Sequence, residues 1–256
     1  MLDELAKFAA ALTDLTRPVI HQYFRQNPDI IKKQDNSPVT MADQQVEQIL
    51  RAAIRYRYPD HSIIGEEQSN HIGDAPYTWV IDPIDGTRSF SCGNPLFGTL
   101  IGILEHGQPQ IGVIDLPMLE NRWLGQMGKS CYCNTSLCQT SSVRDLASAR
   151  IATTSSTLLG DEGRPKFERL AAACRVVNYG GDCANYAYLA SGWCDLVVEA
   201  NLQAYDIMAA VAVVTAAGGV VSRWDGTPIH LDDFDGSIIA AASPELHAAA
   251  VSYLSN

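Results

Sequence analysis

Two aspartates at the end of an apolar run constrain this chain more than any other feature. Residues 79–81 (Trp-Val-Ile) are apolar and typical of a buried strand, and Asp82 follows directly. Because Pro83 cannot donate a ladder hydrogen bond, we expect the strand to end at Asp82. Asp85 comes three residues later. Two carboxylates therefore leave one sheet edge together, and their repulsion is relieved if a cation lies between them or if one keeps its proton.

The chemistry of this segment suits phosphate ester hydrolysis. Carboxylate oxygens are the ligands of hard ions such as Mg²⁺, and the backbone N–H groups of Gly86 and Thr87 can hold a phosphate. Asp-Pro-x-Asp-Gly is also an ordinary turn signal. The continuation through Ser89-Phe90 makes the string longer than a turn requires. We therefore interpret it as the centre of a magnesium-dependent phosphomonoesterase.

The string W-V-I-D-P-I-D-G-T-R-S-F at residues 79–90 resembles the signature of the inositol monophosphatase family of metal-dependent phosphatases. The resemblance extends over almost the whole chain. It implies a mixed α+β and α/β fold, layered as an αβαβα sandwich. It also implies two or three Mg²⁺ ions per site, a small-molecule phosphate ester as substrate, and a homodimer.

The resemblance assigns the metal ligands. Glu66, Asp82 and the carbonyl of Ile84 would hold one ion, and Asp82, Asp85 and Asp206 a second. Taken alone, Glu66 after a glycine is an ordinary solvated acid, and Asp206 is an ordinary helix cap. Glu66 also counts as catalytic, because its ion would activate the attacking water. Most inositol phosphatases carry Trp-Asp where this chain has Tyr-Asp at 205–206.

The resemblance also supplies the residues that orient the attacking water. Residues 39–43 match the family pattern V-T-x-A-D, so Asp43 is expected to pair with Thr87. From the residues alone, Asp43 completes a helix cap begun by Thr40. Gly86 and Thr87 are the expected phosphate-binding residues.

Several longer segments, including residues 179–199, resemble the histidinol-phosphatases of this fold. Asp182 and Glu199 are then the acids expected to bind the cationic parts of L-histidinol phosphate. Asn185 is a weaker candidate for binding the imidazole, and a structural role is favoured for it. Asp182 could instead cap a helix, and Glu199 could be a solvated strand end. Gln203-Ala204 replaces the Lys-Pro common in that branch, which could relax specificity.

Three alternatives to histidinol phosphate hydrolysis stay open. One is an inositol-1-phosphatase or a broad sugar-phosphate phosphatase. Another is a relative acting on 3′-phosphoadenosine 5′-phosphate, although the chain has no added basic or adenine-stacking insert. The third is a catalytically silent scaffold, which would be expected to have lost an essential residue. The chain keeps all five such residues, which are Glu66, Asp82, Asp85, Thr87 and Asp206.

Composition restricts the partners and the compartment. The chain has 29 acids against 18 bases, a formal charge of −11, which disfavours nucleic acid and anionic membranes as partners. Its seven cysteines are an odd number without a C-x-x-C pair, so we expect free thiols in a reducing compartment. The N-terminus lacks signal-peptide character, and no apolar span reaches membrane length. These features predict a cytoplasmic protein.

The pattern of apolar residues predicts one phosphatase unit, 1–256, with two halves. Residues 1–146 form an α+β half with helices on one face of an antiparallel sheet, and it carries Glu66, Asp82, Asp85 and Thr87. Residues 147–256 form an α/β half that carries Asp182, Glu199 and Asp206. Expected helices span residues 2–23, 41–58, 167–174, 183–191 and 207–217, with a last one from Pro244. Residues 161–165 are expected to form a turn.

Overall fold

The computed structural model describes residues 1–25, 30–32 and 38–255. Its largest sheet has seven strands, in the order in which they occur along the chain. These are β3 Ser62–Gly65, β4 Tyr77–Asp85, β5 Gly98–Glu105, β6 Gln108–Leu116, β7 Asn121–Gln126, β8 Cys131–Cys133 and β9 Ser136–Cys138. All neighbouring strands are antiparallel except β3 and β4, which are parallel.

A second sheet has five strands in the order β11-β10-β12-β14-β13. Their bounds are β10 Arg150–Thr153, β11 Val176–Tyr179, β12 Leu196–Glu199, β13 Val220–Ser222 and β14 Ile238–Ala241. A separate two-stranded ribbon pairs β1 (Ile30–Lys32) with β2 (Pro38–Thr40). Most of the polar loop expected between them lies outside the described residues.

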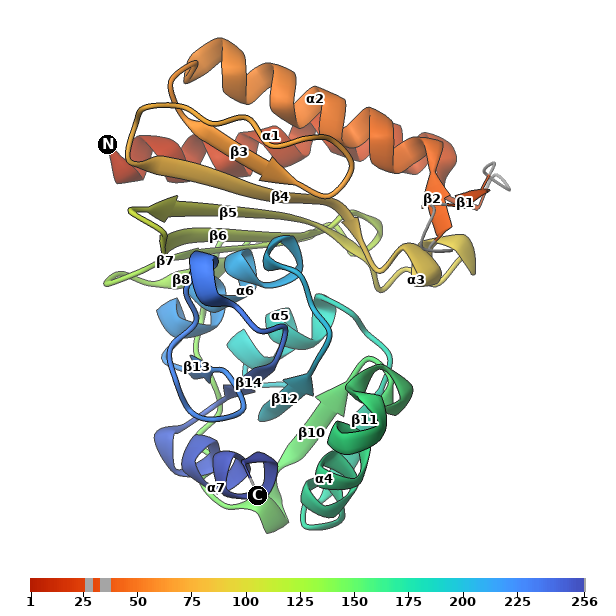
Figure 1. Cartoon of the computed structure of the whole chain (residues 1–256), viewed down its shortest axis with the longest axis vertical. Helices are drawn as coiled ribbons and strands as arrows, with labels where there is room; N and C mark the ends of the chain where they lie inside the picture. The colour runs from red at the N-terminus through yellow and green to blue at the C-terminus, as the bar shows by residue number, and fades with distance from the viewer. Residues whose placement is uncertain (26–29, 33–37, 256) are drawn as a thin grey trace.

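Helices and sheets alternate in five layers (Figure 1). Helices α1 (Leu2–Tyr23) and α2 (Met41–Arg57) cover one face of the large sheet. Helices α5 (Ala184–Ala190) and α6 (Ala204–Ala216) lie between the two sheets, and α4 (Gly160–Ala172) and α7 (Pro244–Leu254) cover the outer face of the second. The predicted αβαβα sandwich is confirmed.

Alternation along β4 explains why the large sheet is covered on both faces. Trp79 and Ile81 belong to the core cluster shared with α1 and α2, whereas Val80 between them belongs to the cluster shared with α6. Successive side chains of a strand point to opposite faces, so an uninterrupted apolar run requires cover on both sides. Because helices of residues 147–256 cover the sheet of residues 1–146, we propose that the chain folds as one unit.

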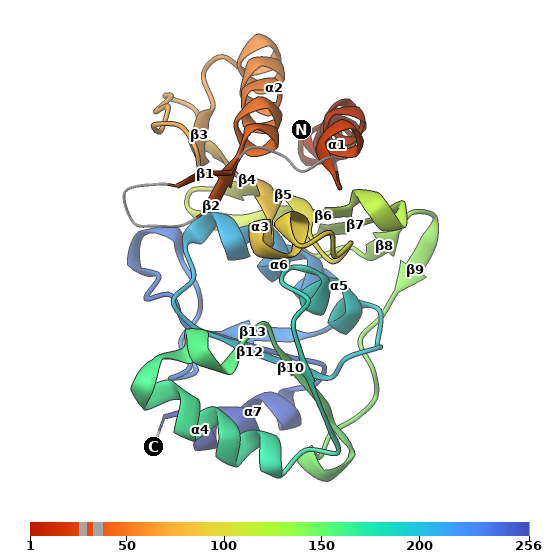
Figure 2. The ribbon, with the colours of Figure 1, turned by 90° about the vertical axis from the view of Figure 1, so that its right-hand side faces the viewer.

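Helix α6 is apolar on all sides because it is enclosed between two sheets. It approaches the large sheet closely: a Cβ atom at Gly112 would lie 2.0 Å from the carbonyl oxygen of Ala209. The glycine therefore lets the helix lie directly on the sheet, with the first turn of α6 beside the end of β4. Figure 2 shows the short helix α3 (Thr87–Ser91) at the same end of the sheet, next to α5 and α6.

Four details of the expected secondary structure were wrong. Strand β4 continues past Asp82 to Asp85, because a bulge between these residues accommodates the proline. The first-half sheet is not purely antiparallel, since β3 pairs in parallel with β4. Residues 161–165 form the beginning of α4 rather than a turn. Helix α6 begins at Ala204, so Asp206 lies inside its first turn.

Candidate active site

Three carboxylates from two distant segments meet at one end of the large sheet. Asp82 and Asp85 come from the bulged end of β4, and Asp206 comes from the first turn of α6. One oxygen of each lies within 4.8 Å of the others. The bulge lets both β4 aspartates reach the same place, since it changes the direction in which side chains leave the strand.

Backbone donors fix two of these carboxylates. The N–H of Cys183 donates to Oδ2 of Asp85 at 2.6 Å, and the N–H of Gln203 donates to Oδ2 of Asp206 at 2.6 Å. The second contact is half of a capping box, because Gln203 also caps the start of α6. The capping interpretation of Asp206 is therefore compatible with a position in the acid cluster.

The cluster concentrates negative charge in a buried place. Burial, followed by the charges of neighbouring acids, raises the pKa of Asp82 and of Asp85 well above the ordinary aspartate value. Burial also raises the pKa of Asp206 to about 7. Among the described residues, Oδ1 of Asp82 is buried without a hydrogen-bond partner. Such a site needs positive charge to become fully ionised.

The residues present fit a hard divalent cation. The donors are all oxygens, they converge, and one of them is buried without a protein donor. Mg²⁺ prefers such ligands, and a cation between them would remove the repulsion that raises their pKa values.

The other expected residues of this centre lie around the three acids. Glu66, just after β3, lies outside the 4.8 Å group but lines the same cleft as Asp206, and its charge raises the pKa of Asp82. The charge of Asp43, in the first turn of α2, has the same effect. Thr87 Oγ1 donates to the carbonyl of Ile84 at 3.4 Å. The Asp43–Thr87 pair and the metal-binding role of the Ile84 carbonyl stay predictions.

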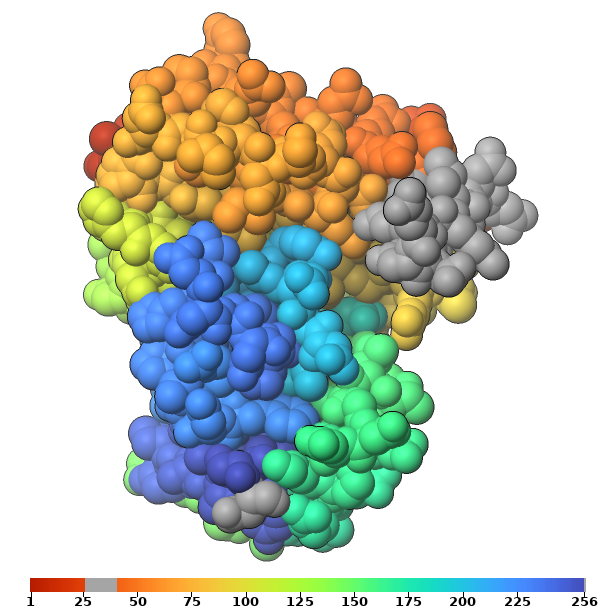
Figure 3. Space-filling view, viewed as in Figure 1, coloured from red at the N-terminus to blue at the C-terminus, as the bar shows by residue number. Residues whose placement is uncertain are grey.

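Asp206 opens into a cleft of about 490 Å³ between the two halves of the chain. The space-filling view shows the surface hollowed between the gold, cyan and green segments (Figure 3). The cleft is lined by charged and polar residues from five segments, which are Glu66, Gly86, Thr87, Arg88, Ser89, Thr154, Ser155, Gly180, Asp182, Asn201, Gln203, Tyr205 and Asp206, together with Leu158. The expected phosphate-binding residues Gly86 and Thr87 therefore face the same space as the acids.

Asp182 and Glu199 line a smaller cavity of about 70 Å³ that adjoins Asp85 and Asp206. Glu199 is buried at the end of β12. Its carboxylate accepts hydrogen bonds from the Thr154 N–H at 3.0 Å, the Thr154 hydroxyl at 2.5 Å and the Tyr186 hydroxyl at 2.8 Å. It is therefore not a solvated strand end. Burial raises the pKa of both Asp182 and Glu199.

Asn185 does not line either cavity. It is 1% exposed, and its Nδ2 donates to the carbonyl of Gly180 at 3.0 Å. This contact holds the turn that precedes Asp182. The geometry supports a structural role for Asn185, and its role in substrate binding stays a prediction.

Sequence reasoning missed the residues that hold Asp182 and Glu199, the two acids expected to bind substrate. Ser89 donates to Asp182 across 93 positions, and Thr154 and Tyr186 hold Glu199 across 45 and 13 positions. No local pattern marks these contacts, because each joins segments that meet only in the folded chain. Arg88, which also lines the cleft, gave no separate signal in the string that contains it.

The layered fold and the acidic cleft together define a phosphatase-type site, and comparison with known proteins identifies the family. The model of the inositol monophosphatase family matches residues 1–256. The chain belongs to this family of metal-dependent phosphatases, and it is a phosphomonoester hydrolase by class.

Relatives with three different names are similar to this chain. It is 43% identical over 227 residues to a bifunctional phosphatase of Arabidopsis thaliana (IMPL2, chloroplastic), covering 88% of this chain and 66% of that protein. It is 32% identical over 230 residues to a histidinol-phosphatase of Chlorobaculum parvum, covering 90% and 86%. It is also 32% identical over 249 residues to inositol monophosphatase 1 of Xenopus laevis, covering 89% and 84%.

A solved structure agrees with the fold. An inositol monophosphatase from Zymomonas mobilis superposes with a TM-score of 0.90 at 38% identity, covering 99% of this chain and 98% of that one.

Two expectations from composition concern the cysteines and the absence of a membrane-spanning segment. All seven cysteines are free thiols. Within the described residues, none of the helices has the length and the apolar character that a bilayer crossing demands.

Proposed function

We propose that this protein is a Mg²⁺-dependent phosphatase that hydrolyses L-histidinol phosphate to L-histidinol and phosphate, a step of histidine synthesis. The observation that carries the catalytic part is the convergence of Asp82, Asp85 and Asp206 within 4.8 Å. Asp182 and Glu199, the acids that line the smaller cavity, carry the choice of substrate.

The acid cluster would hold two or three Mg²⁺ ions. Glu66, Asp82 and the Ile84 carbonyl form one set of ligands, and Asp82, Asp85 and Asp206 form the other. When bound, these cations would lower the pKa of water and neutralise charge on the phosphoryl oxygens. Asp82 belongs to both sets, so we assign it to metal binding rather than to nucleophilic attack.

The chain's own groups would orient the reactants. Gly86 is the N-cap of α3, and the first N–H groups of a helix have no intrahelical acceptor. The N–H groups at Gly86 and Thr87 would bind phosphate oxygens. The hydroxyl of Thr87 and the carboxylate of Asp43 would hold the attacking water in line. No phosphorylated side chain is required.

The substrate cavity favours a positively charged leaving group. Histidinol carries an ammonium group and an imidazole, and Asp182 and Glu199 line the cavity next to the acid cluster. A carboxylate in a partly buried cavity attracts an ammonium ion more strongly than it attracts a neutral hydroxyl. The similarity to a protein named histidinol-phosphatase supports the same substrate.

Inositol 1-phosphate, or a broader set of sugar phosphates, is the second candidate. Relatives named inositol monophosphatase match at a similar identity. Gln203, which lines the cleft, and Ala204 after it stand where the histidinol-phosphatase branch commonly carries a lysine and a proline. The silent-scaffold alternative is disfavoured, because Asp82, Asp85 and Asp206 converge and Glu66 and Thr87 line the same cleft as Asp206.

A phosphate-release assay with Mg²⁺ tests this proposal. We expect kcat/KM to be highest for histidinol phosphate among a panel that also holds inositol 1-phosphate, fructose 1,6-bisphosphate and 3′-phosphoadenosine 5′-phosphate. Asp182→Asn should lower kcat/KM for histidinol phosphate by about tenfold while affecting inositol 1-phosphate much less. A preference for inositol 1-phosphate in the unmodified enzyme would overturn the substrate assignment.

We also propose that the protein is a cytoplasmic homodimer that binds neither nucleic acid nor membranes. The charge of −11 supports the last two statements. The seven free thiols support a reducing compartment. Light scattering at several protein concentrations would test the dimer.

A further inference from the structure

Two hydrogen bonds tie the catalytic loop to the turn that carries Asp182. The N–H of Cys183 donates to Oδ2 of Asp85 at 2.6 Å, and the hydroxyl of Ser89 donates to Oδ2 of Asp182 at 2.8 Å. Ser89 lies on α3, directly after the aspartate loop, whereas Asp182 lies just before α5. The expected metal centre and the expected substrate pocket are therefore joined by a pair of adjacent contacts.

The backbone of the turn places Asp182 against the loop. Gly180, Gly181 and Asp182 all have positive φ angles, of 85°, 113° and 44°. Aspartate tolerates this left-handed region better than most residues. A Cβ atom at Gly86 would lie 2.8 Å from Oδ2 of Asp182, so the carboxylate occupies the space that a side chain at position 86 would need.

Ser89 holds this carboxylate without cancelling its charge. Within the described residues, its hydroxyl makes the one hydrogen bond to the side chain of Asp182, and it uses Oδ2. A lysine or arginine at position 89 would neutralise the acid, whereas a serine orients it and leaves its charge and its other oxygen for a ligand. Both residues line the cleft of about 490 Å³.

We propose that Ser89 is a positioning residue that sets substrate choice, by fixing Asp182 where it binds the ammonium group of a cationic phosphate ester. The inference rests on the proposed function, because it needs a substrate whose leaving group carries a positive charge. It extends that function to a residue that lines the cleft but not the smaller cavity with Asp182 and Glu199. Ser89 acts through Asp182 and does not itself touch the phosphoryl group.

The test compares Ser89→Ala with Ser91→Ala on the same helix. Ser91 Oγ has no hydrogen-bond partner in the described part of the chain, so its removal is a matched control. The readout is the ratio of kcat/KM for histidinol phosphate to kcat/KM for inositol 1-phosphate. We expect Ser89→Ala to lower this ratio about tenfold, mainly through the KM for histidinol phosphate. Ser91→Ala should leave the ratio unchanged. Ser89→Thr keeps a hydroxyl at this position, so it should give the ratio of the unmodified enzyme.

The same change in an Asp182→Asn background shows whether Ser89 acts through Asp182. There the ratio should already be low, and Ser89→Ala should not lower it further. Melting curves of all variants separate misfolding from a change in specificity.

The outcomes distinguish the two proposals. If the unmodified enzyme prefers histidinol phosphate and Ser89→Ala keeps that preference, this inference is overturned and the proposed function stands. An additive loss in the Asp182→Asn background also overturns it. If the unmodified enzyme shows no preference for the ammonium-bearing ester, the proposed substrate and this inference are both overturned.

Discussion

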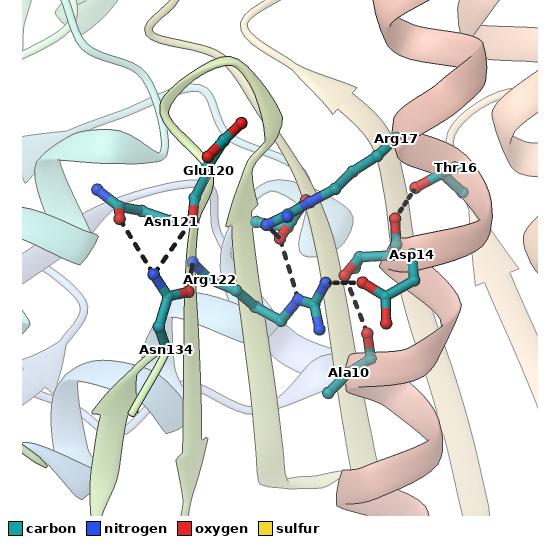
Figure 4. Close-up of polar contacts among 10 residues, drawn as sticks. Ala10, Asp14, Thr16, Arg17, Glu120, Asn121, Arg122 and Asn134 are labelled. Carbon is teal, nitrogen blue, oxygen red and sulfur yellow. Dashed lines mark hydrogen bonds and ion pairs between the residues drawn. The ribbon is translucent and has the colours of Figure 1, made fainter. Parts of the chain in front are cut away.

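Two buried aspartates on neighbouring parts of one sheet have opposite surroundings. Asp115 on β6 is fully buried, and it accepts hydrogen bonds from Arg17 at 3.0 and 2.7 Å and from Arg122 at 3.1 Å. Asp82 on β4 is 1% exposed, and the charges that act on it belong to other acids. Figure 4 shows Arg17 approaching from α1 and Arg122 from β7, with Asp14 beside it.

The difference separates a structural charge from a functional one. Asp115 on β6 is paired with Arg122 on the neighbouring strand β7, so the chain itself supplies the compensating charge. Its hydrogen bonds raise the pKa of Arg17. Burial and neighbouring acids instead raise the pKa of Asp82. A buried charge must be compensated, and at Asp82 the compensation has to come from a ligand.

The largest expected effect is on catalysis at the uncompensated cluster. Asp82→Asn should lower kcat/KM with Mg²⁺ by about a thousandfold or more, because it removes a ligand shared by both proposed ions. Without metal, the variant should melt no lower than the unmodified protein. The neutral amide of asparagine is not repelled by the neighbouring carboxylates. Phosphate release and melting in a chelator measure the two effects. A variant with normal activity would show that Asp82 is not a metal ligand.

The compensated cluster should behave in the opposite way. Asp115→Asn should lower the free energy of unfolding by about 3 kcal/mol, because two arginines lose their acceptor charge. The folded variant should keep its kcat. Urea unfolding and the assay on folded protein measure these quantities. If Asp115→Asn unfolded at the same urea concentration as the unmodified protein, the structural role would be contradicted.

Asp195 and Asp206 should make stability depend on pH in opposite directions. Burial alone would raise the pKa of Asp195, but hydrogen bonds from Arg150 and Ser141 lower it below 3.8. Its contribution to stability is therefore complete above about pH 4 and is lost below that. The pKa of Asp206 is raised to about 7, so its contribution is complete below pH 3.8 and is lost as the pH rises toward 7.

Melting curves in a chelator from pH 3 to pH 8 measure both effects. Added Mg²⁺ should remove the loss near neutral pH and leave the acid loss unchanged, because only Asp206 belongs to the acid cluster. A loss near pH 7 that persists in Mg²⁺ would contradict the assignment of that titration to the cluster.

The smallest expected effect is at a solvent-exposed ion pair. Arg144 and Glu245 are 71% and 49% exposed in their side chains and lie 3.0 Å apart. Arg144→Ala should change the free energy of unfolding by no more than about 0.5 kcal/mol. Urea unfolding of Arg144→Ala and Asp115→Asn under the same conditions measures the two losses. If Arg144→Ala lowered the free energy of unfolding as much as Asp115→Asn does, burial would not explain why the Asp115 ion pairs stabilise the fold more than the Arg144–Glu245 pair.

The sequence predicted the parts of the site that are contiguous. Asp82, Asp85, Gly86 and Thr87 follow one another at the end of an apolar run, so local rules place them together. Asp206 could be placed there only by family resemblance, since its local pattern indicates a helix cap. The layered fold followed from the same resemblance.

The rest depended on contacts that no local rule encodes. The bulge that carries β4 through to Asp85 depends on pairing with β5, and proline alone indicated an earlier end. The hydrogen bond between Ser89 and Asp182 joins residues 93 positions apart. The hydrogen bond from the Asn185 side chain to the carbonyl of Gly180, which agrees with the structural interpretation of this residue, likewise has no local signal.

The most direct test of the account is calorimetric titration of the chelated protein with Mg²⁺ in the presence of inorganic phosphate. The account predicts saturable binding to the unmodified protein and to Asp115→Asn, and loss of that binding in Asp82→Asn. Equal Mg²⁺ binding by Asp82→Asn and the unmodified protein would contradict the claim that Asp82, Asp85 and Asp206 form the metal centre.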